Sequence, residues 1–195
     1  MRINSYENEI LGISMIVFIH GANATSKSWS YILSKIDANH ITVDYDSSLG
    51  FRRNIISIRS QIPTEEPIQI VGHSLGGIYG LYLTQTHNVT KGLTLATPYA
   101  GVAVADFMKM IFPGSHLLKD IGKYSRFITK SRNIKIKVPW TQIITTRGSL
   151  PWYLEKNDGI VPISSMTCRN DINYLELPYN HYEILYSDEV VNLIT

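Results

Sequence analysis

The sequence predicts an α/β fold: a three-layer sandwich around a mainly parallel, doubly wound sheet of about six strands. Short β-branched, apolar runs alternate along the chain with segments whose apolar residues recur at helical spacing. The runs are almost continuously apolar, which is typical of strands that helices cover on both faces of a parallel sheet. The chain has 195 residues, of which 44% are hydrophobic, and this length suits one domain over 1–195.

The first half of the chain contains four of the expected strands. They are Met15–Ile19, Ile41–Tyr45, Ile68–Val71 and Gly92–Ala96. The helices expected between them are 29–36, Phe51–Ile62 and Leu75 to about Thr86. Thr25 and Ser26 can cap the first of these helices, and Pro63 ends the second.

The second half contains two more expected strands, Trp140–Thr145 and Asn173–Leu177, and a closing helix over Tyr182–Ile194. The segment 97–137 has no assigned place in the sheet. Its apolar residues form one short helix around Phe107 and a second helix after it. We expect a small cap or lid over the site here, although one of the helices can equally be the crossover between two strands.

A glycine-rich turn follows the strand at Ile68–Val71 and has the sequence Gly72-His73-Ser74-Leu75-Gly76. This is the G-x-S-x-G pattern, in which a sharp strand-to-helix turn exposes the serine oxygen above the sheet. The flanking glycines lack the Cβ atoms that would collide with neighbouring backbone. A phosphate-binding turn is disfavoured, because the turn has no lysine and lacks the G-x-x-x-x-G-K-[ST] pattern. Ser74 is therefore the candidate nucleophile.

A serine hydroxyl is a poor nucleophile until a base takes its proton. Of the six histidines, His181 follows the last expected strand, so it lies at the carboxyl edge of the sheet within reach of Ser74. His73 adjoins the nucleophile and should point into the fold if Ser74 points out of it. His181 is therefore the candidate base.

The base in turn needs a carboxylate that orients it and stabilises its charged form. Asp158 lies in the loop after the strand at Trp140–Thr145. Asp171 and Glu176 are weaker alternatives, because one precedes the final strand and the other lies inside it. With Asp158 as the acid, the nucleophile, acid and base follow one another in the chain order of α/β-hydrolases.

Ester hydrolysis also needs two backbone N–H groups that face the carbonyl oxygen as it becomes charged. One donor should be Leu75, the residue after the nucleophile. The other should come from the glycine-bearing loop after the first strand, where we expect Ala22 to be the donor, with Asn23 as the fallback.

Five segments occur in the order seen in lipase-like α/β-hydrolases. They are Phe18-Ile19-His20-Gly21, Gly72–Gly77, Ala96-Thr97-Pro98, Asn157–Pro162 and His181. The sequence resembles this family from about residue 15 to 194, and it is similar to small bacterial lipases and to the GPI-deacylase-like branch of serine esterases. The resemblance implies ester hydrolysis through an acyl-enzyme, with no metal and no organic cofactor. The chain departs from the pattern at Tyr99, where many relatives carry a histidine.

The resulting hypothesis is a serine carboxylic-ester hydrolase, of the esterase or lipase type, that acts on a small-molecule or lipid ester. Its catalytic residues would be Ser74, Asp158 and His181, and its oxyanion donors Ala22 and Leu75. The candidate substrate-binding residues are Asn23, Tyr99, Phe107 and Ile160. The alternatives are a thioesterase, amidase or peptidase on the same triad, or a non-catalytic binding module.

Charge and composition exclude other classes. The net charge is only +2, so we expect no nucleic-acid partner, and the basic residues between 119 and 137 fit a solvated face. The longest apolar run is too short to span a bilayer, so no transmembrane segment is expected, while peripheral membrane contact and the oligomeric state stay open. The sequence as given contains no signal peptide, which predicts a cytoplasmic protein, with export as the alternative if a signal was removed. A single cysteine, Cys168, excludes an intramolecular disulfide and an all-cysteine metal site.

Overall fold

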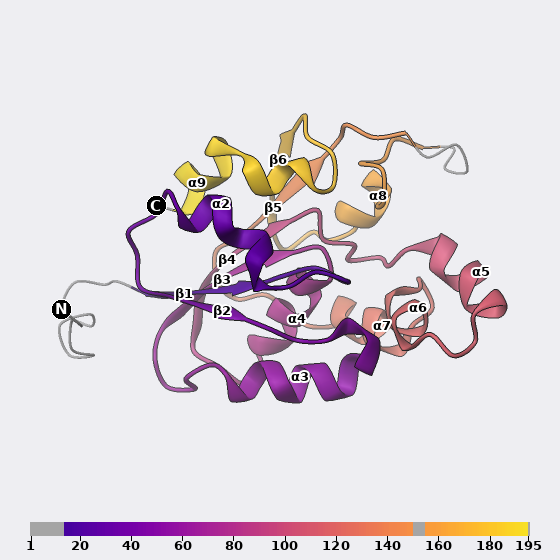
Figure 1. The fold of residues 1–195 in the computed structure, drawn as a ribbon, viewed down its shortest axis with the longest axis horizontal. Coiled ribbons are helices and arrows are strands. Elements are labelled where there is room, and N and C mark those ends of the chain that lie inside the picture. The colour runs from indigo at the N-terminus through magenta and orange to yellow at the C-terminus, as the bar shows by residue number, and fades with distance from the viewer. Residues whose placement is uncertain (1–13, 150–154, 195) are drawn as a thin grey trace.

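The computed structural model describes residues 14–149 and 155–194, and the sheet within them has six parallel strands (Figure 1). The strands are β1 (Met15–Ile19), β2 (His40–Val43), β3 (Ile68–His73), β4 (Val89–Leu95), β5 (Trp140–Thr145) and β6 (Asn173–Leu177). Their order across the sheet is β2-β1-β3-β4-β5-β6, and every neighbouring pair is parallel. The predicted fold class is therefore confirmed.

The strand order reverses its direction between β1 and β3. The chain passes from β1 outward to β2, then returns past β1 to β3, and continues to the opposite edge through β4, β5 and β6. In sheets of this kind, ligands bind outside the carboxyl ends of the strands at such a switch point. The topology therefore directs attention to the loops that follow β1 and β3.

Helices cover both faces of the sheet. One face carries α3 (Phe51–Ser60), α4 (Leu75–Leu83) and α7 (Arg126–Arg132); the other carries α2 (Ser30–Leu33), η3 (Glu183–Tyr186) and α9 (Asp188–Ile194). Successive side chains of a strand point to opposite faces. In β1, Val17 and Ile19 belong to the core under α4, whereas Ile16 and Phe18 belong to the core under α2 and α9. This double burial explains why β1 is apolar at every position.

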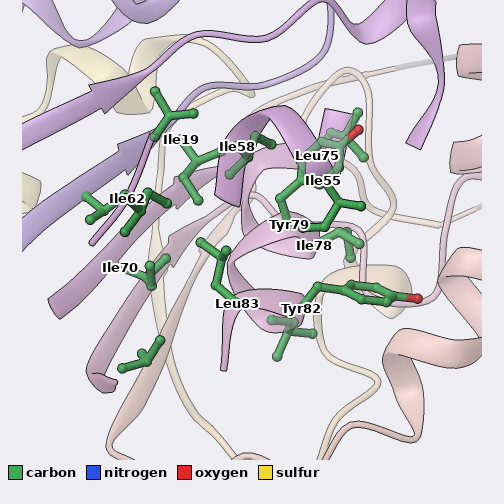
Figure 2. Close-up of a cluster of buried hydrophobic side chains, with 14 of the residues drawn as sticks. Ile19, Ile55, Ile58, Ile62, Ile70, Leu75, Ile78, Tyr79, Tyr82 and Leu83 are labelled. Atoms are coloured by element: carbon green, nitrogen blue, oxygen red, sulfur yellow. The ribbon is translucent and has the colours of Figure 1, made fainter. Parts of the chain in front are cut away.

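Helix α4 is buried along its whole length. It packs between the sheet and α3, as Figure 2 shows for the side chains of Leu75, Tyr79 and Leu83. On the α3 side, the ring of Phe51 stacks on Tyr79 with 4.6 Å between the ring centroids. Because α4 is held from two sides, its first turn gives residue 74 a fixed position.

Two expected helices are broken in ways that apolar spacing does not reveal. The helix expected over 29–36 is a 3₁₀ turn, η1 (Ser26–Trp29), followed by the short α2. Thr25 precedes η1 but makes no side-chain cap, whereas the Ser26 hydroxyl donates to Asp44 Oδ2. The closing helix expected over 182–194 is interrupted at Ser187, whose Oγ accepts from the N–H of Val190 and so starts α9.

Other expected boundaries move by a few residues. The helix that starts at Leu75 ends at Leu83, short of Thr86, and β4 begins at Val89, earlier than Gly92. Two short helices lie in loops between the strands: η2 (Ser47–Leu49) after β2, and α8 (Ile163–Met166) before β6.

The segment 97–137 forms three helices: α5 (Ala103–Ile111), α6 (His116–Ile121) and α7. The second helix expected here is therefore two helices, separated near Gly122. Helix α7 joins the core, since Ile128 is buried and Phe127 stacks on Phe51 with 4.4 Å between ring centroids. It is thus a crossover helix, while α5 and α6 lie at the carboxyl end of the sheet. That this segment acts as a lid stays a prediction.

Among the residues described, none of the helices combines the length and the apolar character needed to cross a membrane.

Candidate active site

Ser74 lies in a strained turn between β3 and α4. Its backbone has φ 51° and ψ −122°, a conformation that costs a residue with a side chain about 1–3 kcal/mol. The N–H of Ser74 donates to the carbonyl of Leu95, 2.8 Å away, which ties the turn to β4. Gly76 allows the turn to approach β1, because a Cβ at this position would lie 2.0 Å from the carbonyl oxygen of Ile19. The tight packing holds Ser74 in a conformation that the chain would not otherwise prefer.

The structure brings Ser74, His181 and Asp158 together in one chain of hydrogen bonds. His181 Nε2 lies 3.0 Å from Ser74 Oγ, and His181 Nδ1 lies 2.7 Å from Asp158 Oδ2. The backbone N–H of His181 also donates to the carbonyl of Asp158, 3.0 Å away. All three side chains are buried. With the Nδ1 proton directed at the carboxylate, Nε2 faces the serine hydroxyl as an acceptor.

The Asp158 carboxylate accepts four hydrogen bonds in a buried position. Oδ2 accepts from His181 and from the hydroxyl of Thr145 at 2.5 Å, while Oδ1 accepts from the N–H groups of Ile160 at 3.0 Å and Val161 at 2.7 Å. Burial by itself would raise the pKa of Asp158, but the hydrogen bonds and the charge of His181 outweigh it and lower that pKa. Asp158 is therefore held in its ionised form beside the base.

The two weaker acid candidates have other positions. Asp171 forms a bidentate ion pair with Arg169: Oδ1 accepts from Nε at 2.9 Å and Oδ2 from Nη2 at 2.7 Å. Glu176 is exposed on the edge strand β6. Asp158 is the only one of the three that contacts His181 in the described part of the chain.

His73 points into the fold, as expected from the outward direction of Ser74. Its Nε2–H donates to the carbonyl of His181, 2.8 Å away, so it holds the loop that carries the base. Burial, followed by the proximity of His181, lowers the pKa of His73 to about 3, and its ring stays neutral near pH 7. The second nitrogen, Nδ1, is buried and has no hydrogen-bond partner among the residues described.

The loop after β1 lies close to Ser74, because a Cβ on Gly21 would lie 3.2 Å from the Cβ of Ser74. Asn23 has a positive φ of 54°, and its own N–H donates to Ser47 Oγ, 3.0 Å away. The fallback donor is therefore already engaged, and Ala22 stays the predicted second oxyanion donor. Leu75 is the first residue of α4, so its N–H has no acceptor within the helix. It therefore stays the predicted first oxyanion donor.

His20, the first residue of this loop, is buried and stacks on Tyr45 with 4.2 Å between ring centroids. Its Nδ1 lies 2.8 Å from the carbonyl oxygen of Gly21, and the hydroxyl of Tyr45 donates to the His20 carbonyl at 2.8 Å. These bonds hold the carbonyl groups of the two successive peptides that lead to Ala22.

A cavity of about 320 Å³ opens at Ser74. Its walls come mainly from apolar side chains of three regions: the end of the Asp158 loop, the residues after His181, and α6 with the residue before α5. These are Ile160, Val161, Tyr182, Leu185, Leu117, Leu118, Ile121 and Val102. Of the predicted substrate-binding residues, Asn23 and Ile160 line the cavity.

Tyr99 and Phe107, the other two predicted substrate-binding residues, do not line the cavity at Ser74. Tyr99 is fully buried, and its hydroxyl lies 2.9 Å from Nε1 of Trp140 and 2.8 Å from Oγ1 of Thr94. It is therefore a core residue. Phe107 is exposed on α5. Other side chains of the segment 97–137, such as Leu117, line the cavity in their place. This is the apolar segment that was expected to cover the site.

Thr145 was missed by the sequence analysis. It is the last residue of β5 and is fully buried, and its hydroxyl donates a hydrogen bond to the Asp158 carboxylate. Its place at the carboxyl end of a strand is the signal that could have identified it.

Comparison with known proteins identifies the family of the chain. The alpha/beta hydrolase family matches residues 16–156, well over half of the chain. A comparison with curated proteins gave no match.

Several solved structures share the fold. The mature lipase BlEst2 from Bacillus licheniformis has a TM-score of 0.68 and 16% identity, over 93% of this chain and 90% of the lipase. A lipase-esterase related protein from Clostridium acetobutylicum has a TM-score of 0.64 and 15% identity over 93% of both chains. The Vlm2 thioesterase domain has a TM-score of 0.59 and 14% identity, over 93% of this chain and 95% of that domain. With the family match and the lipase-like fold together, the chain belongs to the alpha/beta hydrolase family.

Proposed function

We propose that the protein is a serine hydrolase that cleaves carboxylic esters through an acyl-enzyme on Ser74. The observation that supports this most is the unbroken chain of hydrogen bonds from Asp158 through His181 to Ser74, which ends at an apolar cavity. A serine hydroxyl in such a chain can lose its proton as it attacks a carbonyl carbon.

In the first half of the reaction, Ser74 Oγ attacks the ester carbonyl carbon while His181 Nε2 takes its proton. The carbonyl oxygen becomes negatively charged, and the N–H groups of Leu75 and Ala22 are the donors that would stabilise it. As the tetrahedral intermediate collapses, the alcohol leaves with the proton from His181. Asp158 stays ionised, orients the imidazole and stabilises its charged form.

In the second half, a water molecule attacks the acyl-serine and gives its proton to His181. The acid then leaves, and Ser74 regains its hydroxyl. The cavity volume of about 320 Å³ is at the lower end of the roughly 300–1,000 Å³ typical of ligand pockets. Together with the apolar walls, this supports an apolar acyl group of modest size.

A fluorophosphonate probe tests the proposal, because it reacts with a serine only when a neighbouring base activates it. We expect one covalent label per folded chain, located by mass spectrometry on Ser74. Heat-unfolded protein and the Ser74→Ala variant serve as controls and should stay unlabelled. A folded chain without label would contradict the proposal and favour a non-catalytic binding module.

The same preparation distinguishes ester from thioester and amide hydrolysis. We expect kcat/KM to be highest for a p-nitrophenyl ester within a panel of matched acyl esters, thioesters and anilides. A clear preference for the thioester would reassign the activity to the thioesterase alternative, which shares the triad.

Thr145 should act as a positioning residue for Asp158. In Thr145→Val the carboxylate loses the 2.5 Å hydrogen bond from the hydroxyl, while the shape of the side chain is kept. We expect kcat to fall roughly tenfold, since a hydrogen bond to a charged group contributes about 1.5–3 kcal/mol. The pKa of Asp158 should also rise, because a donor to its ionised form is removed, so protonation of this carboxylate should inactivate the variant at a higher pH than it inactivates the parent.

The conservative variant Thr145→Ser is the control for this prediction. It restores a hydroxyl at the same position and should recover both kcat and the original pH profile. If valine and serine reduce kcat equally and leave the profile in place, Thr145 contributes only packing.

A further inference from the structure

Helix α5 and the turn after it expose a run of large apolar side chains. Phe107, Met110, Ile111 and Phe112 are 62%, 77%, 55% and 54% exposed, and we call these four residues the α5 patch. The helix is anchored by its other side, where Ala105 is buried in a small cluster with Val102. Figure 1 shows α5 projecting at the edge of the molecule. Adjacent exposed apolar side chains of this size mark an interaction surface, unlike single scattered ones.

Positive charge is concentrated in the same part of the chain. The segment 97–137 contains eight Lys or Arg residues and two Asp or Glu residues, a net charge of +6. The other 154 residues contain ten basic and fourteen acidic residues, a net charge of −4. A total charge near zero therefore conceals a strong asymmetry.

Both acidic residues of this segment are engaged by the protein itself. Asp106 pairs with Lys109 at 2.6 Å, and Asp120 accepts the N–H of Phe51 at 2.6 Å. Lys119 and Lys123, in contrast, are exposed, and neither forms an ion pair within the described residues. Their ammonium groups are available to an external anion.

A backbone hydrogen bond joins the segment that carries the two lysines to the start of the helix that carries the α5 patch. The N–H of Val102, just before α5, donates to the carbonyl of Ile121 at the end of α6, 2.9 Å away. Lys123 lies two residues after Ile121, and its Cα would be 2.8 Å from a Cβ on Gly101. Val102 and Ile121 also line the cavity at Ser74. Helix α5, which bears the α5 patch, therefore begins next to the wall of the cavity.

We propose that the α5 patch, together with Lys119 and Lys123, docks the protein on an anionic lipid surface. The apolar side chains enter the boundary between headgroups and acyl chains, and the ammonium groups approach the lipid phosphates. Docking itself does not depend on catalysis. That it brings a lipid ester to Ser74 rests on the proposed function.

A second copy of the chain is the competing occupant of such a patch. A symmetric pair would bring two segments of net charge +6 face to face, and their repulsion opposes that contact. An anionic lipid surface matches both the apolar side chains and the positive charge, so it is the occupant that the charge distribution favours.

Vesicle sedimentation with the Ser74→Ala protein tests the docking, since this variant should not consume the lipid. We expect much stronger binding to vesicles of phosphatidylcholine mixed with phosphatidylglycerol than to phosphatidylcholine alone, and weaker binding at high salt. Lys119→Gln with Lys123→Gln should weaken binding to the anionic vesicles about 30-fold, because each lysine near such a surface adds about fivefold. Met110→Asp with Phe112→Asp should weaken it at least tenfold, roughly the effect of removing two apolar anchors.

Matched variants elsewhere control for exposure and charge. Ile56 on α3 is 68% exposed, so Ile56→Asp tests an equally exposed apolar residue outside the patch. Lys27→Gln with Lys91→Gln removes two exposed lysines from outside the segment. Both controls should bind the anionic vesicles as the parent does.

Three results would overturn the docking proposal: equal binding to neutral and anionic vesicles, unchanged binding in the patch variants, or a dimer in sedimentation velocity that Met110→Asp disrupts. Turnover of a soluble p-nitrophenyl ester by the chain with Ser74 intact is measured alongside. If that turnover is absent while vesicle binding follows the expected pattern, the proposed function fails and the docking stands. If turnover is normal and vesicle binding fails, only the docking is wrong.

Discussion

The Ser74→Ala variant is expected to lose turnover of a p-nitrophenyl ester by roughly 10⁴-fold or more in kcat, since the attacking oxygen is gone. The fold should survive. Alanine keeps the Cβ atom and the φ of 51°, so the variant loses only the hydrogen bond to His181, and its free energy of unfolding should change by about 1 kcal/mol or less. Steady-state kinetics and urea unfolding of the same preparation measure both effects.

Ser165 provides a matched control. It is also buried, and its hydroxyl makes one hydrogen bond, to the carbonyl of Gly101 at 2.7 Å, but it lies outside the cavity lining. Ser165→Ala should therefore cost a similar amount of stability and leave kcat nearly unchanged. Turnover by Ser74→Ala within tenfold of the parent would show that another group performs the reaction, and the proposed function would have to be abandoned.

The sheet could be predicted from the sequence because most of its strands are buried on both faces. A strand such as β1, apolar at every position, contrasts sharply with the amphipathic helices around it. Helix interruptions could not be predicted in the same way. Apolar residues keep helical spacing on both sides of Ser187, so the break between η3 and α9 leaves the hydrophobic pattern intact.

That Ser74, Asp158 and His181 lie close together could be predicted because each of them follows a strand, and the carboxyl ends of parallel strands meet at one edge. Tyr99 also follows a strand, yet its side chain turns inward to Trp140, a contact between residues 41 positions apart. The orientation of Phe107 could not be predicted from the sequence for a related reason. Which side of α5 faces the protein depends on where Ala105 packs, and the apolar composition of the helix does not specify this.

Gly76→Ala is expected to have the largest effect on the fold. In a helix, alanine is favoured over glycine by about 1 kcal/mol, so helix propensity alone predicts a gain in stability. The added Cβ, however, would lie 2.0 Å from the carbonyl oxygen of Ile19 and 2.5 Å from that of His20, and both are backbone atoms that cannot swing aside. We therefore expect a net loss of about 3 kcal/mol or more, typical of severe overpacking.

The clash in Gly76→Ala should also lower kcat. To relieve it, the start of α4 must move away from β1, which separates Ser74 and the Leu75 N–H from the loop that carries Ala22. At about 2–4 °C per kcal/mol for a chain of this size, Tm should fall by about 10 °C, and kcat should fall in whatever protein remains folded. Gly114→Ala is the control, because no atom lies within 4 Å of its added Cβ, and it should leave Tm within a few degrees of the parent. If Gly76→Ala were as stable and active as this control, the close approach of α4 to β1 would not be what fixes the nucleophile.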